Sequence, residues 1–310
     1  MQHADTTQNV YVEAYYSVPI FPVGSTARSY TITESSQGMA LSPAGNLYLS
    51  MPYPGSPDVI DEYSSDGKTL LNTLTGVQYP ADLVFDSTGT LYATSVDPDS
   101  IYVFATGNTT PSYTITSNLS GPRDPVVDGS NNLYVVNGPN SSKQVWIDVF
   151  RPGAKLPSYR IQPSKPALKV PVLIVAAPNG TLYVADGGGS EIFVYNAGQK
   201  SPAYTITKGI ASPVALTLDA QGNLYVANYS SQTDSGSITV YAPGSSAPSY
   251  TIPIRSTPGN YQPPGSMALD SNGNLYVPFF NEDVIVYSAG TSHRLRTLKV
   301  KRPNLIVVGN

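Results

Sequence analysis

Short runs in which hydrophobic and polar residues alternate recur along the whole chain, at intervals of about 45 residues. Seven such runs end close to a Gly, Ser or similar turn residue; they read VPIFPVG, VIDEYSS, IYVFATG, IDVFRPG, IFVYNAG, ITVYAPG and VIVYSAG. Alternation over four to eight residues is typical of a β-strand with one face more buried than the other. The pattern therefore predicts seven copies of one β-rich unit.

A second strand precedes each of these runs. It begins with Asn or Thr, followed by Leu or Val and then Tyr, which places tyrosines at Tyr11, Tyr48, Tyr92, Tyr134, Tyr183, Tyr225 and Tyr276. Neighbouring tyrosines are 37 to 51 residues apart, and counting from Tyr276 through Asn310 and on to Tyr11 gives 45. The repeat thus returns to its starting point within one repeat length.

Two more strands complete each unit. After the alternating run comes SYTI, LNTL, SYTI, SYRI, AYTI, SYTI or LRTL, and before the tyrosine strand lies an apolar run: GMALS, DLVFD, DPVVD, LIVAA, ALTLD or SMALD. Four strands in a unit of this length are the signature of a β-propeller. We therefore predict an all-β protein, a seven-bladed propeller of four-stranded blades, with residues 9–310 as a single domain behind a tail at 1–8.

The first unit has no apolar run of its own. The segment NVYVEAYYSVPIF follows only MQHADTTQ, whereas NLIVVG at 304–309 has no unit after it. We expect this C-terminal run to supply the innermost strand of the first blade, beside three N-terminal strands. Pairing between the two chain ends would close the ring and remove a free sheet edge.

Composition narrows the possible partners. Charged residues are 12% of the chain, the net charge is −4, and there is no cysteine. No Lys/Arg-rich face is apparent, which argues against nucleic acid as a partner, and no apolar run is long enough for a membrane span. A surface rich in Ser, Thr, Asn and Tyr favours a secreted or periplasmic monomer, although this chain carries no signal sequence.

The hairpins between the first and second strands carry a repeated acidic residue. They read DSTGT, DGSNN, DAQGN and DSNGN, beginning at Asp86, Asp128, Asp219 and Asp270. Asp at the start of a tight turn caps its own turn by accepting hydrogen bonds from the backbone, and Gly or Asn supplies a positive φ. We interpret these aspartates as structural.

The unit SPVALTLDAQGNLYVANYSSQTDSGSITVYAPG at 212–244 resembles the NHL repeat, and PVLIVAAPNGTLYVADGGGSEIFVYNAG at 171–198 is similar. The resemblance extends over nearly the whole chain. It implies a propeller, but NHL-like propellers serve as binding domains, lyases, lactonases and extracellular scaffolds. Virginiamycin B lyase-like propellers use channel histidines and magnesium, whereas the histidines here are His3 and His293, in the tail and in a turn. Gluconolactonase-like propellers hold a divalent cation with oxygen ligands at the channel mouth.

Charged residues interrupt the start of the innermost strand in two neighbouring blades. Asp82, Arg123 and Asp124 stand where other blades carry small, apolar or amide residues. These charges in adjacent blades should face one another near the channel, either as an Arg ion pair flanked by two carboxylates or as an oxygen-ligand site for a cation or substrate.

A second set of polar residues lies just after the tyrosine strand. Asn137, Asp186 and Asn228 occupy the same position in three consecutive blades, and could bind a hard cation or sugar hydroxyls, or hydrogen-bond to the backbone. If the channel holds Ca²⁺ or Mg²⁺, the expected carboxylate ligands are Asp82, Asp124 and Asp186.

Aromatic residues are frequent in the connections expected around the channel mouth. Exposed rings would suit sugar or peptide stacking, and the alternative is that several of them pack under their own loops; the residues are Tyr15, Tyr16, Tyr53, Tyr79, Tyr229, Tyr261, Phe279 and Phe280. Together with Asp82, Arg123, Asp124, Asn137, Asp186 and Asn228, these residues favour a module that binds a carbohydrate or protein on its long-loop face. The alternative is a divalent-cation-dependent hydrolase or lyase, lactonase-like, at the channel mouth, and the sequence leaves open whether the protein is an enzyme.

Overall fold

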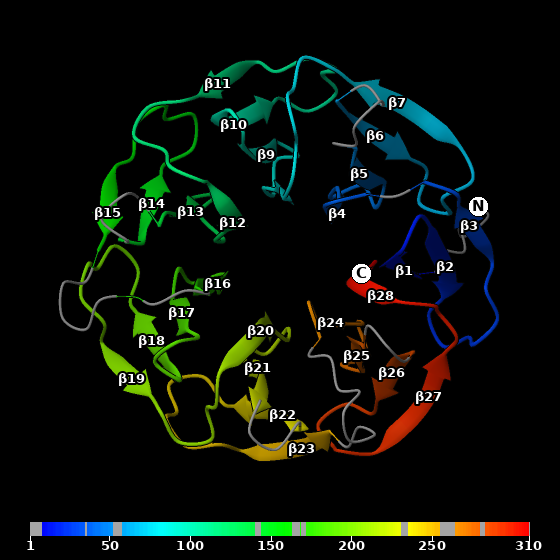
Figure 1. Ribbon diagram of the computed structural model, residues 1–310, viewed down its shortest axis with the longest axis vertical. Helices are drawn as coiled ribbons and strands as arrows, with labels where there is room; N and C mark the ends of the chain where they lie inside the picture. Colours follow the sequence, from blue (N-terminus) through cyan, green and yellow to red (C-terminus); the bar gives the residue numbers. More distant parts are fainter. Residues whose placement is uncertain are drawn as a thin grey trace, which may run out of the picture.

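The fold is a closed ring of seven four-stranded antiparallel sheets around a central axis (Figure 1). The computed structural model describes residues 8–34, 36–51, 58–139, 144–162, 168, 172–230, 235–254, 264–279 and 283–309. Every regular element in these ranges is a strand. Accordingly, none of them contains a helix that is long and apolar enough to cross a membrane. The predicted all-β, seven-bladed propeller is confirmed.

Each blade has its strands in the order first to fourth from the axis outward. The first blade contains β28 (Pro303–Val308), β1 (Asn9–Ala14), β2 (Val18–Pro22) and β3 (Tyr30–Ile32). The second contains β4 (Met39–Leu41), β5 (Leu47–Met51), β6 (Val59–Tyr63) and β7 (Leu70–Leu74). The third contains β8 (Leu83–Phe85), β9 (Leu91–Val96), β10 (Asp99–Phe104) and β11 (Tyr113–Ile115).

The remaining four blades repeat this order. The fourth contains β12 (Arg123–Val127), β13 (Leu133–Asn137), β14 (Trp146–Phe150) and β15 (Tyr159–Ile161). The fifth contains β16 (Val172–Ala176), β17 (Leu182–Asp186), β18 (Glu191–Tyr195) and β19 (Tyr204–Ile206). The sixth contains β20 (Pro213–Leu218), β21 (Leu224–Ser230), β22 (Ser235–Tyr241) and β23 (Tyr250–Ile254). The seventh contains β24 (Ala268–Leu269), β25 (Leu275–Pro278), β26 (Val284–Tyr287) and β27 (Arg294–Leu298).

The two ends of the chain close the ring, as the strand count predicts. β28 pairs antiparallel with β1, with Val10 opposite Val308 and Val12 opposite Ile306. The N–H of Gly309 donates to the carbonyl oxygen of Asn9 at 2.9 Å and extends the ladder by one bond. The first blade is therefore built from residues about as far apart as the sequence allows.

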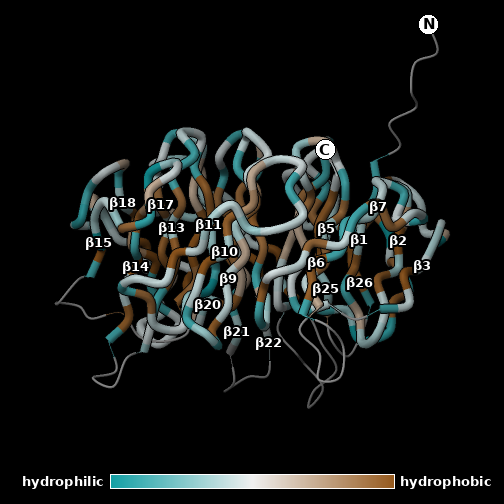
Figure 2. Tube along the Cα trace, turned by 90° about the horizontal axis from the view of Figure 1, so that it is seen from above, coloured by the Kyte–Doolittle hydropathy of each residue, from teal (hydrophilic) through white to brown (hydrophobic). Residues whose placement is uncertain are grey.

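Hydrophobic packing between blades holds the ring together. Seven clusters of buried side chains are found among the described residues, and each combines residues from two neighbouring blades. For example, Ile238 and Val240 of the sixth blade pack with Val277 of the seventh. Tyrosines of the second strands are buried in or beside these clusters, which fits their predicted packing role. Figure 2 shows the hydrophobic positions concentrated in the strands, between two more polar faces.

The two faces of the ring differ in their connections. The turn face carries the hairpins that join the first to the second strand and the third to the fourth; it is the upper face in Figure 2, where β28 ends. The crossover face carries the connections from one blade to the next and those from the second to the third strand.

The hairpin aspartates on the turn face act as predicted. Oδ1 of Asp128 accepts hydrogen bonds from the backbone N–H groups of Ser130 and Asn132, both at 2.9 Å. Its Oδ2 accepts from the amide of Asn132 and from the hydroxyl of Tyr134, at 2.9 and 3.0 Å. The same pattern recurs, with Tyr contacts of 3.1 to 3.5 Å, at Asp86, Asp219 and Asp270. These carboxylates are structural.

Candidate functional site on the crossover face

Two carboxylates from neighbouring blades meet where the innermost strands begin on the crossover face. The backbone N–H of Asp124, in β12, donates to Oδ2 of Asp82, just before β8, at 3.0 Å. Asp124 has a φ of +47°, and the pairing of β12 with β13 shifts register between Arg123 and Val126. This bulge turns the N–H of Asp124 toward the neighbouring blade, as bulges at strand ends commonly do.

The carboxylate pair has unusual protonation properties. Burial raises the pKa of Asp82, opposed by the hydrogen bond from Asp124 and the charge of Arg123. Burial and then the negative charge of Asp82 raise the pKa of Asp124 to about 7, although Arg123 opposes both effects. Two carboxylates in a half-buried position resist carrying two negative charges. Near neutral pH, Asp124 is therefore partly protonated.

Arg123 lies beside this pair but does not form the ion pair expected as one alternative. Its Nη1 donates to the carbonyl oxygen of Gly121 at 3.2 Å and to that of Gly138. The ion pairs found among the described residues do not include Arg123. The ion-pair expectation is thus wrong, because the bulge leaves the guanidinium facing two backbone carbonyls. Arg123 ties the connection before β12 to the end of β13.

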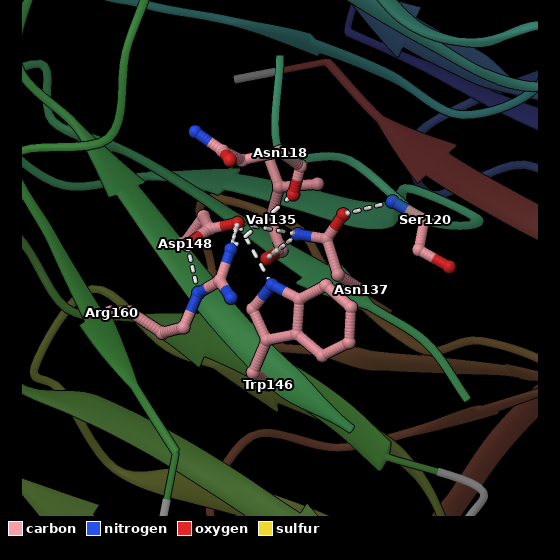
Figure 3. Close-up of polar contacts among 7 residues, drawn as sticks. All are labelled: Asn118, Ser120, Val135, Asn137, Trp146, Asp148 and Arg160. Atoms are coloured by element: carbon pink, nitrogen blue, oxygen red, sulfur yellow. Dashed lines mark hydrogen bonds and ion pairs between the residues drawn. The ribbon is translucent and has the colours of Figure 1, made fainter. Parts of the chain in front are cut away.

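Asn137 belongs to a buried hydrogen-bond network in the fourth blade (Figure 3). Its Oδ1 accepts from the backbone N–H of Ser120 at 3.0 Å, which fixes the connection that enters β12. Its Nδ2 donates to the carbonyl oxygen of Val135 at 3.2 Å and to Oδ2 of Asp148 at 3.3 Å. With both ends of its amide engaged, Asn137 positions the crossover connection.

Asp148 is the centre of this network and is fully buried. Arg160 binds it with two bonds, Nε to Oδ1 at 2.8 Å and Nη2 to Oδ2 at 2.9 Å. The indole N–H of Trp146 donates to Oδ2 at 2.9 Å, and the guanidinium of Arg160 lies 4.5 Å from the centre of the Trp146 ring (Figure 3). Sequence analysis did not single out these three residues. The available signal was a charged residue inside an alternating strand, with Arg160 opposite it in the next strand.

The other two members of the predicted polar set lie in comparable places. Oδ1 of Asn228 accepts from the N–H of Ala211 at 2.9 Å, and its Nδ2 donates to Val226 and Thr239, both at 3.2 Å. Oδ1 of Asp186 accepts from the N–H of Gly189 at 2.9 Å, in the turn after β17. These contacts favour the interpretation that Asn137, Asp186 and Asn228 hydrogen-bond to the backbone over the interpretation that they bind a cation or sugar hydroxyls.

The predicted metal ligands do not gather around one point. Asp82 and Asp124 interact directly, but no group of three or more His, Cys, Asp or Glu side chains arranged for a metal ion occurs in the described parts of the chain, so Asp186 does not join the pair. Calcium requires six to eight oxygen ligands and magnesium a regular octahedron. Two carboxylates alone fit neither ion well, and we derive no chemical step through a cation.

The predicted aromatic residues fall into three groups. Tyr53, Tyr261 and Phe280 lie outside the described residues. Phe279 is only 3% exposed and Tyr229 is half-buried against the hydrophobic cluster between the sixth and seventh blades. Phe279 and Tyr229 thus follow the alternative of packing within the protein, because the residue after β25 turns into this cluster. Tyr15, Tyr16 and Tyr79 are exposed as expected, at 58%, 59% and 51%.

Two of the exposed tyrosines have a backbone conformation that suits glycine. Tyr15 and Tyr16 form the two-residue turn between β1 and β2, closed by two bonds of 2.9 Å between Ala14 and Ser17. Tyr16 has a φ of +64° and Tyr79 a φ of +42°. A bulky side chain in this region costs about 1–2 kcal/mol. Turn formation alone does not account for tyrosine at these two positions.

The comparisons with known proteins identify the fold. A 6-phosphogluconolactonase described as "putative", from Bacteroides uniformis ATCC 8492, superposes with a TM-score of 0.71 at 14% identity, covering 97% of this chain and 99% of that one. The structure of U3-55K gives a TM-score of 0.67 at 14% identity, covering 86% and 82%. A chain of the Mitotic Checkpoint Complex gives 0.66 at 16% identity, covering 94% and 84%.

The sequence comparisons add no family. No protein-family profile matches the chain, and no curated protein matches its sequence. Identities of 14–16% to solved structures establish the propeller fold and nothing about activity. The resemblance to the NHL repeat therefore stays a prediction.

Proposed function

We propose that this propeller is a non-catalytic binding module that takes a carbohydrate or protein ligand on its crossover face. The observation that carries the proposal is the placement of Tyr15, Tyr16 and Tyr79. These have the most exposed aromatic side chains among the described residues, and all three lie in connections of the crossover face.

Physical chemistry supports a binding role for these tyrosines. An exposed phenol ring offers an apolar plane with a polar tip, a combination that is enriched in binding surfaces. Strained backbone conformations cluster at functional sites, where the surrounding structure fixes them. The centres of the Tyr15 and Tyr16 rings are 3.9 Å apart, and the Tyr16 hydroxyl donates to the Tyr15 hydroxyl at 2.8 Å. The two rings thus form one preorganised surface.

The substitution Tyr16→Gly separates a binding role from a structural one. Glycine adopts a positive φ freely, so we expect a higher melting temperature and weaker ligand binding in the same variant. Tyr30→Ser is the matched control, because Tyr30 is also exposed but lies on the outermost strand of the blade.

The binding measurement uses an array of neutral and acidic oligosaccharides, together with affinity capture of protein partners followed by titration of the purified partner. We expect wild-type binding to be reduced at least tenfold by Tyr16→Gly or Tyr79→Gly, and unchanged by Tyr30→Ser. Equal binding by all four proteins, or no binding by the wild type in either assay, would refute the proposal.

The carboxylate pair favours one alternative, a hydrolase of the lactonase type at the channel mouth. A group with a pKa near 7 can take a proton from an attacking water, and Asp124 has a pKa of about 7 beside Asp82. A screen of lactones at pH 7.5 tests this alternative. Activity that Asp124→Asn abolishes would favour the enzyme, whereas absence of turnover by the wild type would favour the binding module.

A further inference from the structure

A pocket lies at the point where the ring closes, between the first and seventh blades. It has a volume of about 330 Å³ and opens between the β1–β2 turn and the connection from β27 to β28. These elements lie at opposite ends of the sequence but side by side in the ring (Figure 1). The lining residues include Tyr15, Ser17, Arg28, Lys301 and Arg302.

The pocket is positively charged although the protein is not. Three cationic side chains line it, and its described lining includes no carboxylate. The net charge of the chain is −4, yet five of its 17 Lys and Arg residues lie within 294–302. Such a local excess of one sign attracts an oppositely charged ligand.

Two of these cations have no counter-ion among the described residues. Lys299 forms an ion pair with Asp283 at 2.6 Å, but neither Arg28 nor Lys301 pairs with a carboxylate in the part of the chain that is described. Arg28 donates to the carbonyl oxygen of Lys299 at 3.2 Å and to Oγ1 of Thr31 at 3.4 Å. These bonds orient the guanidinium and leave several of its five N–H donors for a ligand.

An aromatic plane adjoins the charges. The Tyr15 ring is largely exposed, and the guanidinium carbon of Arg302 lies 5.4 Å from its centre. Ser17, a residue with a hydroxyl group, also lines the pocket. Cations beside a flat ring and a hydroxyl match a ligand that has a carboxylate, an apolar ring face and hydroxyl groups.

We propose that this ring-closing pocket binds an acidic saccharide unit, a uronate, with its carboxylate on Arg28 and Lys301 and its sugar ring against Tyr15. Arginine recognises carboxylates through two parallel hydrogen bonds. The pocket volume is at the lower end of the range for small-ligand sites, which fits a single sugar residue. The proposal rests on the proposed binding function and specifies its ligand class.

Calorimetric titration with trigalacturonate and with neutral galactotriose tests the pocket. We expect the wild type to bind the acidic trisaccharide at least tenfold more tightly than the neutral one, with an affinity that falls as salt is added. The double variant Arg28→Met/Lys301→Met should lose this preference. Lys200→Met/Lys208→Met is the matched control, because it removes the same charge from exposed lysines of other blades and should bind like the wild type.

Three results would overturn the uronate site. The first is that the wild type does not bind trigalacturonate. The second is that the control variant loses the preference for the acidic trisaccharide as fully as the Arg28→Met/Lys301→Met variant does. The third is that inorganic phosphate competes at the same concentration as the uronate, which would show a phosphate site. In each case, neutral oligosaccharide or protein binding that Tyr16→Gly weakens would still support the proposed function. If the wild type bound no ligand at all, both the uronate site and the proposed binding function would be refuted.

Discussion

The turn face and the crossover face of this propeller are built from the same seven repeats but follow different rules. On the turn face, four blades repeat one hydrogen-bond scheme around Asp86, Asp128, Asp219 and Asp270. On the crossover face the polar residues differ from blade to blade. They form a carboxylate pair, an Arg bound to carbonyl oxygens, and a buried Asp–Arg–Trp network. Repetition thus fixes the framework, and individual residues differentiate the other face.

The backbone shows the same division. On the turn face the positive φ angles in the hairpins between first and second strands fall mostly on glycine, as at Gly89 and Gly222. On the crossover face many fall on residues other than glycine, and those at Tyr79, Ser212 and Arg302 each stand directly before a proline that starts or precedes an innermost strand. Strain at non-glycine residues needs support from the surrounding structure. Substitutions on the turn face should therefore act mainly on stability, whereas those on the crossover face should also act on binding or protonation, and on stability where a buried network is broken.

The largest effect should come from opening the ring, on which both faces depend. Deleting residues 303–310 exposes the edge of β1 and removes the buried side chains of Pro303, Ile306 and Val308. At about 1.5–3 kcal/mol for each buried side chain, we expect a loss on the order of 5 kcal/mol in the free energy of unfolding. Chemical denaturation followed by tyrosine and tryptophan fluorescence measures it. An unchanged midpoint would contradict closure by β28.

The second prediction concerns the buried network of the fourth blade. Asp148→Ala leaves the guanidinium of Arg160 and the indole N–H of Trp146 without their partner, so we expect a loss of about 3–5 kcal/mol. The control is Asp66→Ala, which breaks an exposed ion pair with Lys68 of 3.5 Å and should cost less than about 1 kcal/mol. Similar losses in the two variants would show that burial of Asp148 is not decisive.

The third prediction is a pH dependence on the crossover face. The pKa of Asp124 is raised to about 7 from an ordinary value of 3.8. The stability that this carboxyl group contributes is therefore fully present below pH 4 and is lost as the pH rises through 7. Asp124→Asn should remove this slope and make the protein more stable than the wild type at pH 8, by about 2 kcal/mol once solvent contact is allowed for.

Denaturation curves between pH 4 and 8 measure this difference. Asp82→Asn is the informative companion, because removing the neighbouring charge should lower the pKa of Asp124 and reduce the slope without abolishing it. A slope that is the same in all three proteins would assign the pH dependence to other groups.

The smallest effect should be a gain on the turn face. The fifth blade has Ala177 where four other blades have Asp, and there the N–H of Thr181 donates to Oδ1 of Asn179 instead, at 3.0 Å. Ala177→Asp should restore the repeated scheme and raise stability by about 1 kcal/mol. Asp128→Ala should lower it by a similar or larger amount, and thermal melting of both variants checks the pair.

Sequence reasoning recovered the framework because its determinants are local and repeated. The tyrosine strands, the hairpin aspartates and the count of seven units each depend on residues within one unit, and the missing strand of the first blade followed from counting. Closure by β28 required no knowledge of side-chain contacts. The repeat period and the turn-forming residues are enough to predict these features.

The crossover face was harder to predict because its contacts join segments whose relative positions depend on the connections. Asp82 and Asp124 were expected to be close, and they are, but the bulge at Asp124 turned Arg123 to carbonyl oxygens. The pairing of Asp148 with Arg160 depends on the register of β14 and β15. No local pattern in the sequence specifies a bulge or a register shift of this kind.

Closure of the ring by β1 and β28 also constrains how the protein can be synthesised. Among the seven blades, the first begins to emerge from the ribosome before the others, but its innermost strand emerges after all other strands of the propeller, since Asn9 bonds to Gly309. Until translation reaches that strand, β1 presents an unpaired edge to the cell, while the later blades can already stack in order. The edge of β1 in the first blade should therefore need protection from aggregation for longer than any other part of the nascent propeller.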